Sequence, residues 1–430
     1  MSPYKEQAIP TVAVEGKGSW ITDINGQKYL DTMSGLWCVN VGYGREELAQ
    51  AAYEQLKTMP YFPLTQSHLP AIQLAEKLNE WLEGDYVIFF SNSGSEANET
   101  AFKMARQYHQ QNDEPSRYKF ISRYRAYHGN SMGALAATGQ AIRKYKYEPL
   151  APGFIHVSPP DSYRRPSGQS VEEFNLQCAL EIENSIIWEG KETVAAVIME
   201  PAITGGGVLV PHPIYMEKVQ GICHKHSVLL IIDEVICGFG RTGKKFGHMH
   251  FNIKPDIVTM AKGLTSGYLP LSATAVRRDL YERFKGSEEY SYFRHVNTFG
   301  GNPAACALAL KNLEIYENEE LIERSRILGE RLREEMNEIK DHPLVGDIRS
   351  FGFLLGIELV ENKETKEPVA ASKIDKIIAE CKSNGLIIGK NGATVAGFNN
   401  IITLSPPLSS TDEDLEFIVT TVKKAFSDLM

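Results

Sequence analysis

The segment VLLIIDEVICGFGRTGKKFGHMHFNIKPDIVTMAKGL (228–264) decides the fold that we predict for this chain. It contains two of five short apolar runs that recur along the sequence: YVIFF (86–90), KFIS (119–122), VAAVIM (194–199), VLLII (228–232) and IVTM (257–260). Continuous apolar runs separated by helix-length spacers are typical of buried parallel strands joined by crossover helices. We therefore predict a large α/β domain over residues 61–305, with a mostly parallel sheet flanked by helices.

The two ends of the chain, residues 1–60 and 306–430, lie outside this pattern. The first contains TDINGQKYLDT (22–32), in which Asn25-Gly26 is typical of a hairpin turn. The second combines a long helical stretch, the strand-like FGFLLGIELV (351–360) and a final amphipathic helix. Neither end looks large enough to fold alone. We predict that the two associate into one smaller α+β domain.

Composition excludes several classes of function. The 430 residues are 43% hydrophobic, and 45 basic against 54 acidic residues give a net charge of −9 with no basic block. This argues against a nucleic-acid partner or an anionic membrane surface. The six cysteines form no CxxC pair, which favours reduced thiols and the cytoplasm. No apolar run has the length of a signal or membrane segment, and the spacing of the histidines provides no metal site.

Lys262 and Asp233 each lie at the end of a predicted strand. The carboxyl ends of parallel strands face the crevice where open α/β sheets place their ligands. A lysine and a carboxylate are the two groups that pyridoxal chemistry needs, one to form a Schiff base and one to keep the ring nitrogen protonated. Glu200 ends VAAVIM in the same way. Asp233 could instead cap a helix or, with Glu234, serve a metal.

The segment SNSGSEANE (91–99) follows another predicted strand. Ser93, Gly94 and Ser95 would form a turn before a helix, where hydroxyls and free amides make a cup for a phosphate. The alternative is that Ser93 is an ordinary N-cap residue followed by the acidic Glu96.

Two further segments could contact a cofactor. Tyr127 and His128 follow KFISRYRA, so an aromatic ring could stack on the cofactor, or Tyr127 could be a core residue. Thr298 begins TFGGNP before a helix and offers a hydroxyl to a phosphate, or forms a plain turn.

The segment GFGRTG (238–243) satisfies the dinucleotide-binding pattern GxGxxG. However, DEVIC separates it from its strand, and KKFGHMHF is no crossover helix. We therefore disfavour a dinucleotide oxidoreductase.

Together these segments resemble the class III (ω-amino-acid type) pyridoxal-phosphate aminotransferases of fold type I, over nearly the whole length of the chain. The motifs that carry the resemblance are SNSGSEANE (91–99), YHG (127–129), EP (200–201), LLIIDEVICGFGRTG (229–243), DIVTMAKGL (256–264) and NTFGGNPAA (297–305). The resemblance implies a sheet of the seven-stranded type, pyridoxal 5′-phosphate as cofactor, and an amine donor and keto acid as substrates. It also implies a homodimer and a ping-pong reaction between the pyridoxal and pyridoxamine forms.

The resemblance also implies a role for each candidate residue. Lys262 is the Schiff-base lysine and proton shuttle, and Asp233 pairs with the pyridine nitrogen. The remaining cofactor contacts that it implies are Ser93, Gly94 and Ser95 at the phosphate, Tyr127 and Val235 on the two ring faces, His128 and Glu200 near the ring, and Thr298 at the phosphate of the partner subunit.

The segment SGLWCVNVGYGREEL (34–48) resembles the substrate pocket of ω-amino-acid and amine:pyruvate aminotransferases, with Trp37 as a wall. Trp37 could equally be a core residue. MPYFPLT (59–65), with Phe62, resembles the loop that the partner subunit contributes. We therefore expect transfer from an ω-amino acid or primary amine, of the β-alanine or taurine type, to pyruvate.

One departure from the resemblance concerns the substrate acid group. Relatives usually carry a C-terminal arginine that binds it, yet the last arginine here is Arg349. Lys390, Arg143 or a backbone site could replace it. The alternative function is adenosylmethionine-8-amino-7-oxononanoate aminotransferase of biotin synthesis, although Glu96 and the missing arginine depart from that enzyme. An aminomutase and a pyridoxal-binding regulator are further alternatives.

Overall fold

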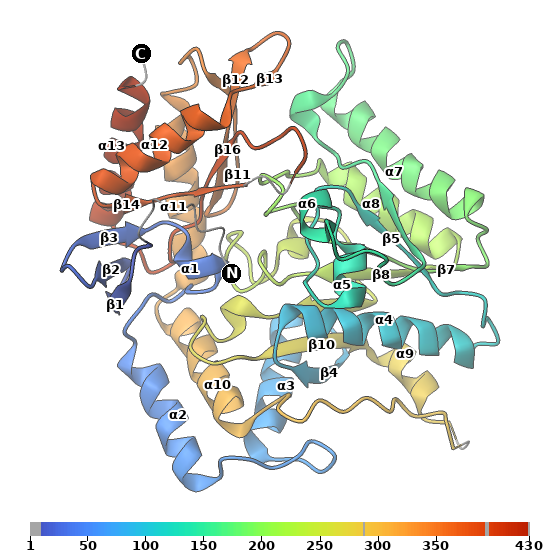
Figure 1. Cartoon of the computed structure of the whole chain (residues 1–430). Coiled ribbons are helices and arrows are strands. Elements are labelled where there is room, and N and C mark those ends of the chain that lie inside the picture. Colours follow the sequence, from blue (N-terminus) through green and yellow to red (C-terminus); the bar gives the residue numbers. More distant parts are fainter. Residues whose placement is uncertain (1–9, 287–288, 392–394, 429–430) are drawn as a thin grey trace.

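A seven-stranded sheet forms the centre of the computed structural model, which describes residues 10–286, 289–391 and 395–428 (Figure 1). Its strands, in spatial order, are β4 (Tyr86–Ser91), β10 (Ser272–Arg277), β9 (Ile257–Met260), β8 (Leu229–Asp233), β7 (Val194–Met199), β5 (Lys119–Arg123) and β6 (Phe154–Val157). The strands from β9 to β6 run parallel to their neighbours, whereas β10 is antiparallel to both β4 and β9. The predicted mostly parallel sheet is therefore confirmed. β6 and β10 had not been predicted.

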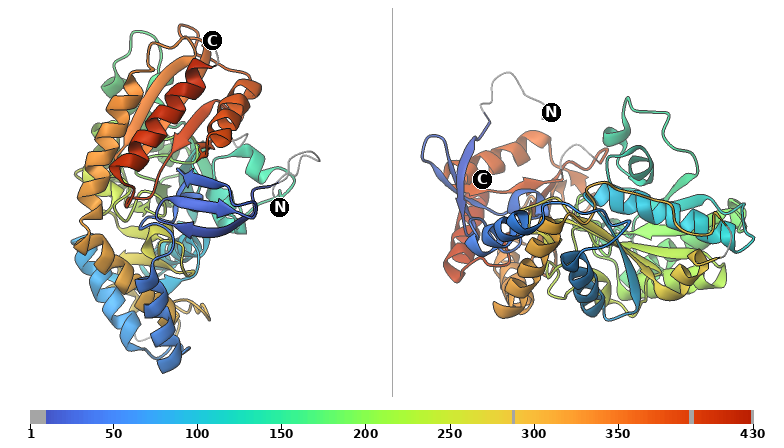
Figure 2. Two further views of the ribbon diagram at one scale, coloured as in Figure 1. Left: turned by 90° about the vertical axis from the view of Figure 1, so that its left-hand side faces the viewer. Right: turned by 90° about the horizontal axis from the view of Figure 1, so that it is seen from below.

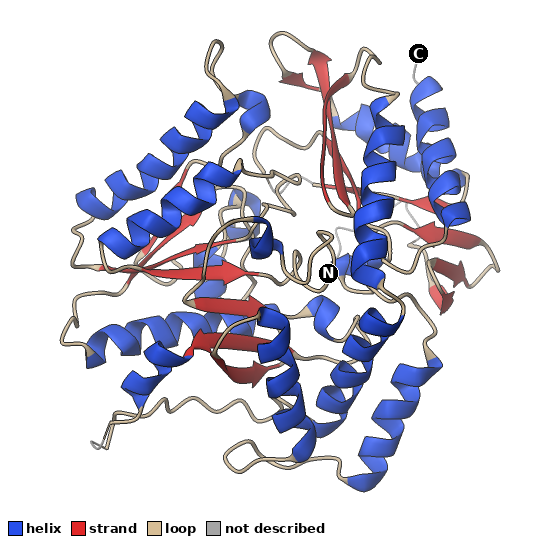
Figure 3. Ribbon diagram, turned by 180° about the vertical axis from the view of Figure 1, so that it is seen from behind, coloured by secondary structure: helices blue, strands red, loops and turns tan. Residues whose placement is uncertain are grey.

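Helices cover both faces of this sheet (Figures 1 and 3). α4 (Gly94–Gln111) packs on one face, and α7 (Val171–Trp188) and α8 (Pro213–Lys225) pack on the other. In β8, Leu229 and Ile231 join the core beneath α4, while Leu230 and Ile232 join the core beneath α7 and α8. Because successive side chains point to opposite buried faces, the strand reads as an unbroken apolar run.

The two ends of the chain meet in a four-stranded sheet of β1 (Ala13–Lys17), β2 (Trp20–Asp23), β3 (Lys28–Asp31) and β14 (Leu386–Ile387). β14 runs parallel to β3 and pairs Leu386 with Leu30. Figure 2 shows the blue N-terminal strands beside the red C-terminal elements. The predicted hairpin is also confirmed: β2 and β3 are antiparallel, and Gly26 has a φ of 79° in the turn.

The C-terminal part adds a second sheet of β11 (Val345–Phe351), β12 (Leu354–Asn362), β16 (Ile401–Leu404) and β15 (Gly389–Lys390), with β13 (Glu367–Pro368) on β12. Its helices are α11 (Leu321–Asn337), α12 (Ala371–Ser383) and α13 (Asp412–Ser427). We propose that these elements and β1–β3 form the smaller domain. The boundaries at 60 and 305 stay predictions, and the second falls inside α10 (Pro303–Asn318), which packs on α2 (Glu46–Thr58) and α3 (Leu69–Leu82).

The remaining helices are short: α1 (Ser34–Trp37), α5 (Met132–Ala137), α6 (Ala141–Lys144) and α9 (Arg278–Tyr281). Within the three described ranges, no helix is long and apolar enough to cross a membrane. The same ranges contain no cluster of three or more side chains suited to holding a metal ion.

Candidate active site

A cavity of about 170 Å³ lies where strands β7, β8 and β9 end and helix α4 begins. The predicted residues that line it are Gly94, Ser95, Tyr127, His128, Glu200, Asp233, Val235 and Lys262. Leu36, Asn98, Gly129 and Ile236, for which no role had been predicted, line it as well. The topology therefore brings together residues that are up to 226 positions apart, from Leu36 to Lys262.

Asp233 is held as an acceptor by three donors. Its Oδ2 accepts from Asn98 Nδ2 and from His128 Nδ1, each at 2.9 Å, and its Oδ1 accepts from the backbone N–H of Val235 at 3.0 Å. Asn98 is itself fixed by Thr259, whose hydroxyl donates to Asn98 Oδ1 at 2.8 Å. These three contacts fix the orientation of the Asp233 carboxylate, which lines the cavity.

Lys262 follows β9 and has a φ of 48°, a left-handed conformation that is uncommon for lysine and costs backbone strain. Its Nζ lies 5.6 Å from the centroid of the Trp37 ring. Burial lowers the pKa of the Lys262 amine, and the charge of Asp233 opposes this shift. Within the described residues, the amine makes no hydrogen bond or ion pair. A partly buried, unpaired amine is suited to nucleophilic attack on a carbonyl carbon.

The first turn of α4 offers free backbone donors. Ser93 caps this helix: its hydroxyl accepts from Glu96 N at 3.2 Å, and Glu96 Oε2 accepts from Ser93 N at 3.2 Å. The alternative that Ser93 is an N-cap residue is therefore confirmed, and Ser93 does not line the cavity. The amides of Gly94 and Ser95 donate to no group among the described residues. Free amides at a helix N-terminus form an anion site.

The cavity wall leaves little room beside these amides. A Cβ at Gly94 would lie 3.0 Å from both methyl carbons of Val235, and a Cβ at Gly129 would lie 2.6 Å from Ser95 Oγ. The buried Nε2 of His128 has no hydrogen-bond partner among the described residues. A lysine, a fixed carboxylate, free helix amides and a glycine-lined wall around one cavity fit pyridoxal 5′-phosphate.

Glu200 fixes the loop that carries Tyr127. Its Oε1 accepts from Tyr127 N at 3.1 Å, and its Oε2 accepts from the amide and the hydroxyl of Thr204 at 3.2 and 2.8 Å. Burial raises the pKa of Glu200. The Tyr127 ring is half-buried, and burial raises the pKa of its hydroxyl. Glu200 thus positions one wall of the cavity through backbone contacts.

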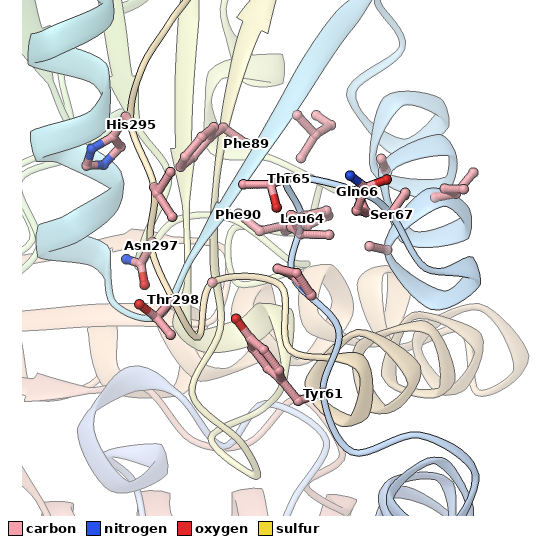
Figure 4. Close-up of a pocket in the computed structure, with 17 residues that line it drawn as sticks. Tyr61, Leu64, Thr65, Gln66, Ser67, Phe89, Phe90, His295, Asn297 and Thr298 are labelled. Carbon is pink, nitrogen blue, oxygen red and sulfur yellow. The ribbon is translucent and has the colours of Figure 1, made fainter.

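Thr298 and Phe62 lie away from this cavity. Thr298 lines a separate pocket of about 300 Å³ together with Tyr61 and Leu64, as Figure 4 shows. Phe62 is 40% exposed and follows Tyr61 at the border of that pocket. The structure of one chain therefore does not bring either residue to Lys262.

Lys390 and Trp37 differ in how they relate to the site. Lys390 does not line the cavity, and its Nζ pairs with Asp375 Oδ1 of α12 at 2.5 Å. Trp37, the last residue of the kinked helix α1, contacts the Lys262 amine through its ring. Trp37 and Lys262 both have positive φ angles. Leu36, and not Trp37, lines the cavity at this point, so the pocket role of Trp37 stays a prediction.

Sequence reasoning missed the role of Arg241, which lies in the GFGRTG segment that we had weighed as a dinucleotide motif. Its side chain is fully buried and donates to the Pro406 carbonyl, to Ser34 Oγ at 3.2 Å and to Asn40 Oδ1 at 2.5 Å. Ser34 and Asn40 flank the loop that carries Trp37. The buried guanidinium therefore connects this loop to the C-terminal part of the chain. The glycine-rich pattern of the GFGRTG segment gives no signal of that role.

Comparisons with known proteins point to one family. Residues 1–426 match the family described as aminotransferase class-III. An uncharacterized aminotransferase of Bacillus subtilis is 65% identical over 98% of this chain and 93% of its own length. A taurine–pyruvate aminotransferase of Bilophila wadsworthia is 43% identical over 97% of this chain and 92% of its own. The crystal structure of a Bacillus anthracis aminotransferase, 61% identical, superimposes with a TM-score of 0.96 over 100% of this chain and 95% of its own.

Proposed function

Because the chain belongs to the class III aminotransferases, which use pyridoxal 5′-phosphate, an amine donor and a keto acid, we propose that it moves an amino group from an ω-amino acid or primary amine to pyruvate by a ping-pong mechanism. The single observation that carries the proposal is the cavity that joins Lys262, Asp233 and the α4 amides. Support for the substrate class comes from the taurine–pyruvate aminotransferase that is 43% identical over nearly the whole chain.

Lys262 would hold the cofactor covalently and, once the donor has displaced it, carry a proton between the donor carbon and the cofactor. When bound, the cofactor supplies an electron sink for the electrons that the donor carbon releases. The amine must be neutral to accept a proton. Burial, which lowers its pKa, increases the neutral fraction at a given pH.

Asp233 would pair with the protonated ring nitrogen of the cofactor. Asn98 and His128 hold Oδ2, and the Val235 amide holds Oδ1, so the carboxylate cannot rotate freely. Val235 and Tyr127, which line the cavity, would cover the two faces of the ring. Glu200 would act near the ring edge by fixing the backbone of Tyr127 at 3.1 Å.

The amides of Gly94 and Ser95 would bind the cofactor phosphate, aided by the positive end of the α4 dipole. Ser93 would act indirectly, as the cap that holds this turn. We propose that the protein is a homodimer in which Thr298 and Phe62 reach the cofactor site of the partner subunit. Exposed apolar side chains in their neighbourhood support this, including Tyr61, Leu64, Val296 and Phe299.

We also propose a cytoplasmic location. All six cysteines are unpaired, and five of them are buried. Unpaired thiols of this kind are typical of a reducing compartment.

The absorption spectrum of the purified protein tests the proposed function. The visible band of lysine-bound cofactor should appear in the wild type and in Lys254→Ala, an exposed-lysine control, and be absent from Lys262→Ala. Adding β-alanine, taurine or propylamine without an acceptor should bleach the band, and pyruvate should restore it. A band that only adenosylmethionine bleaches would support the biotin enzyme instead. If no band forms even with added cofactor, the proposed function is wrong.

A further inference from the structure

We propose that Arg143 binds the anionic end group, a carboxylate or sulfonate, of an ω-amino-acid donor. The proposal rests on the proposed function, because it names the residue that would distinguish ω-amino acids from neutral amines at that site. An anionic substrate end needs a cation that is not already paired with an acid of the protein.

The Nε side of the Arg143 guanidinium is fixed in place. Arg143 lies on α6, and its Nε donates to Gln140 Oε1 at 2.7 Å. Gln140 is buried, and its Nε2 donates to the Arg125 carbonyl at 2.9 Å. The guanidinium carbon of Arg143 lies 4.7 Å from the centroid of the Tyr127 ring. A buried amide and an aromatic ring therefore orient the guanidinium.

The outer end of the same guanidinium is free. Neither terminal nitrogen donates to any described residue, and no described acid lies within ion-pair distance of Arg143. The side chain is exposed, so a small anion can reach it. An arginine with a fixed orientation and two free terminal nitrogens can bind a carboxylate or sulfonate through two parallel hydrogen bonds. Pre-orientation reduces the entropy that binding would otherwise cost.

Several other cations of the chain are already engaged. The pairs are Lys390 with Asp375, Arg125 with Asp161, Arg349 with Glu358 and Arg164 with Glu358. Arg241 is fully buried and donates to Ser34, Asn40 and Pro406. Lys262 is reserved for the cofactor. Among these residues, Arg143 alone retains an unused cationic end group.

Arg143 does not itself line the cavity. Its guanidinium contacts the ring of Tyr127, which lines the cavity together with Lys262 and so connects Arg143 to the reacting centre. The charge of Arg143 acts to lower the pKa of Tyr127, against the larger raising effect of burial. The charge therefore acts on a cavity wall. A donor whose amine is at Lys262 would extend its acid group past Tyr127 to Arg143.

The test compares an acid donor with its neutral counterpart in the holoenzyme. Bleaching of the cofactor band is measured with β-alanine, taurine and 4-aminobutyrate, and with propylamine and butylamine, which carry a methyl group in place of the acid. The variants are Arg143→Gln, Arg143→Lys and the control Lys146→Gln, which removes the same charge from an exposed neighbour. Rate constants against donor concentration separate apparent affinity from the maximal rate.

We expect Arg143→Gln to weaken the apparent affinity for the acid donors about tenfold to hundredfold, as loss of a charge-assisted hydrogen-bonded pair does. The neutral amines should change less than about twofold, Arg143→Lys should recover part of the loss, and Lys146→Gln should behave as the wild type.

Equal losses for acids and neutral amines would show that Arg143 only supports Tyr127 and would overturn the proposal. Unchanged kinetics with the acids, or a wild type that accepts neutral amines but no ω-amino acid, would overturn it as well. A wild type that no amine bleaches would instead refute the proposed function.

Discussion

Replacing Gly94 with alanine should weaken cofactor binding, because Gly94 and Val235 are packed against each other at the wall of the cavity. A Cβ at Gly94 would lie 3.0 Å from both Cγ1 and Cγ2 of Val235, closer than carbon atoms normally approach. Val235 can yield toward the cavity that it lines while the cavity is empty. The bound cofactor would prevent this movement, so the strain should appear in the affinity for the cofactor.

The expected magnitude follows from two opposing effects. Overpacking costs about 1–3 kcal/mol, whereas alanine is favoured over glycine within a helix by about 1 kcal/mol. The helix effect acts on the protein with and without cofactor and cancels from the binding free energy. The remaining cost of about 1–3 kcal/mol corresponds to a loss of affinity of roughly 5-fold to 150-fold.

The assay is a titration of the cofactor-free protein with pyridoxal 5′-phosphate, followed by absorbance. Val235→Ala removes both methyl carbons that the new Cβ would approach, so Gly94→Ala should have little further effect in that background. Gly221→Ala is the matched control, because a Cβ there would meet nothing within 4 Å. Unchanged affinity in Gly94→Ala, or an equal loss with and without Val235, would refute the steric reasoning.

Three other perturbations probe the network around the cavity. Asn98→Ala should destabilise the protein by about 1–3 kcal/mol for each buried partner left unsatisfied. It should also weaken cofactor affinity, since Asn98 donates to Asp233. Thermal unfolding and cofactor titration at wild-type values would contradict this. Because burial lowers the pKa of Lys262, its neutral amine is populated below the usual pKa of about 10.4. The rate of cofactor loading, followed by stopped-flow absorbance, should therefore rise with pH and level off below that value, and a plateau at or above it would count against a depressed pKa. Arg241→Lys loses the planar fork that reaches three acceptors and should lower the free energy of unfolding by about 1–3 kcal/mol, which denaturant unfolding can measure; an unchanged midpoint would show that a single ammonium suffices.

Much of the large sheet could be predicted because its strands are buried on both faces. VAAVIM and VLLII became β7 and β8 almost residue for residue, since both sets of alternate side chains contact a core. β10 was missed because SATAVR mixes small and polar residues. The hydroxyl of Thr274 donates to the Ala97 carbonyl within the buried interior, a contact between residues 177 positions apart that no local pattern reveals.

The site could be predicted to the extent that its residues follow strands or begin a helix. Lys262, Asp233, Glu200 and Gly94 are of this kind, and all of them line one cavity. Asn98 was missed because an asparagine inside a helix has no local signal for its contact with Asp233, 135 positions away.

The sequence by itself determined the fold class, the cofactor chemistry and the positions along the chain of the strands that carry it, because burial and strand-end chemistry leave patterns that are local in the chain. Only the tertiary structure decided which cations are free. Lys390 and Arg143 were both candidates in the sequence. Folding places Asp375 against the first, whereas the second contacts a buried amide and a tyrosine ring and pairs with no acid among the described residues. Pairing depends on distances between residues far apart in the chain, and those distances are set by packing and not by composition or spacing.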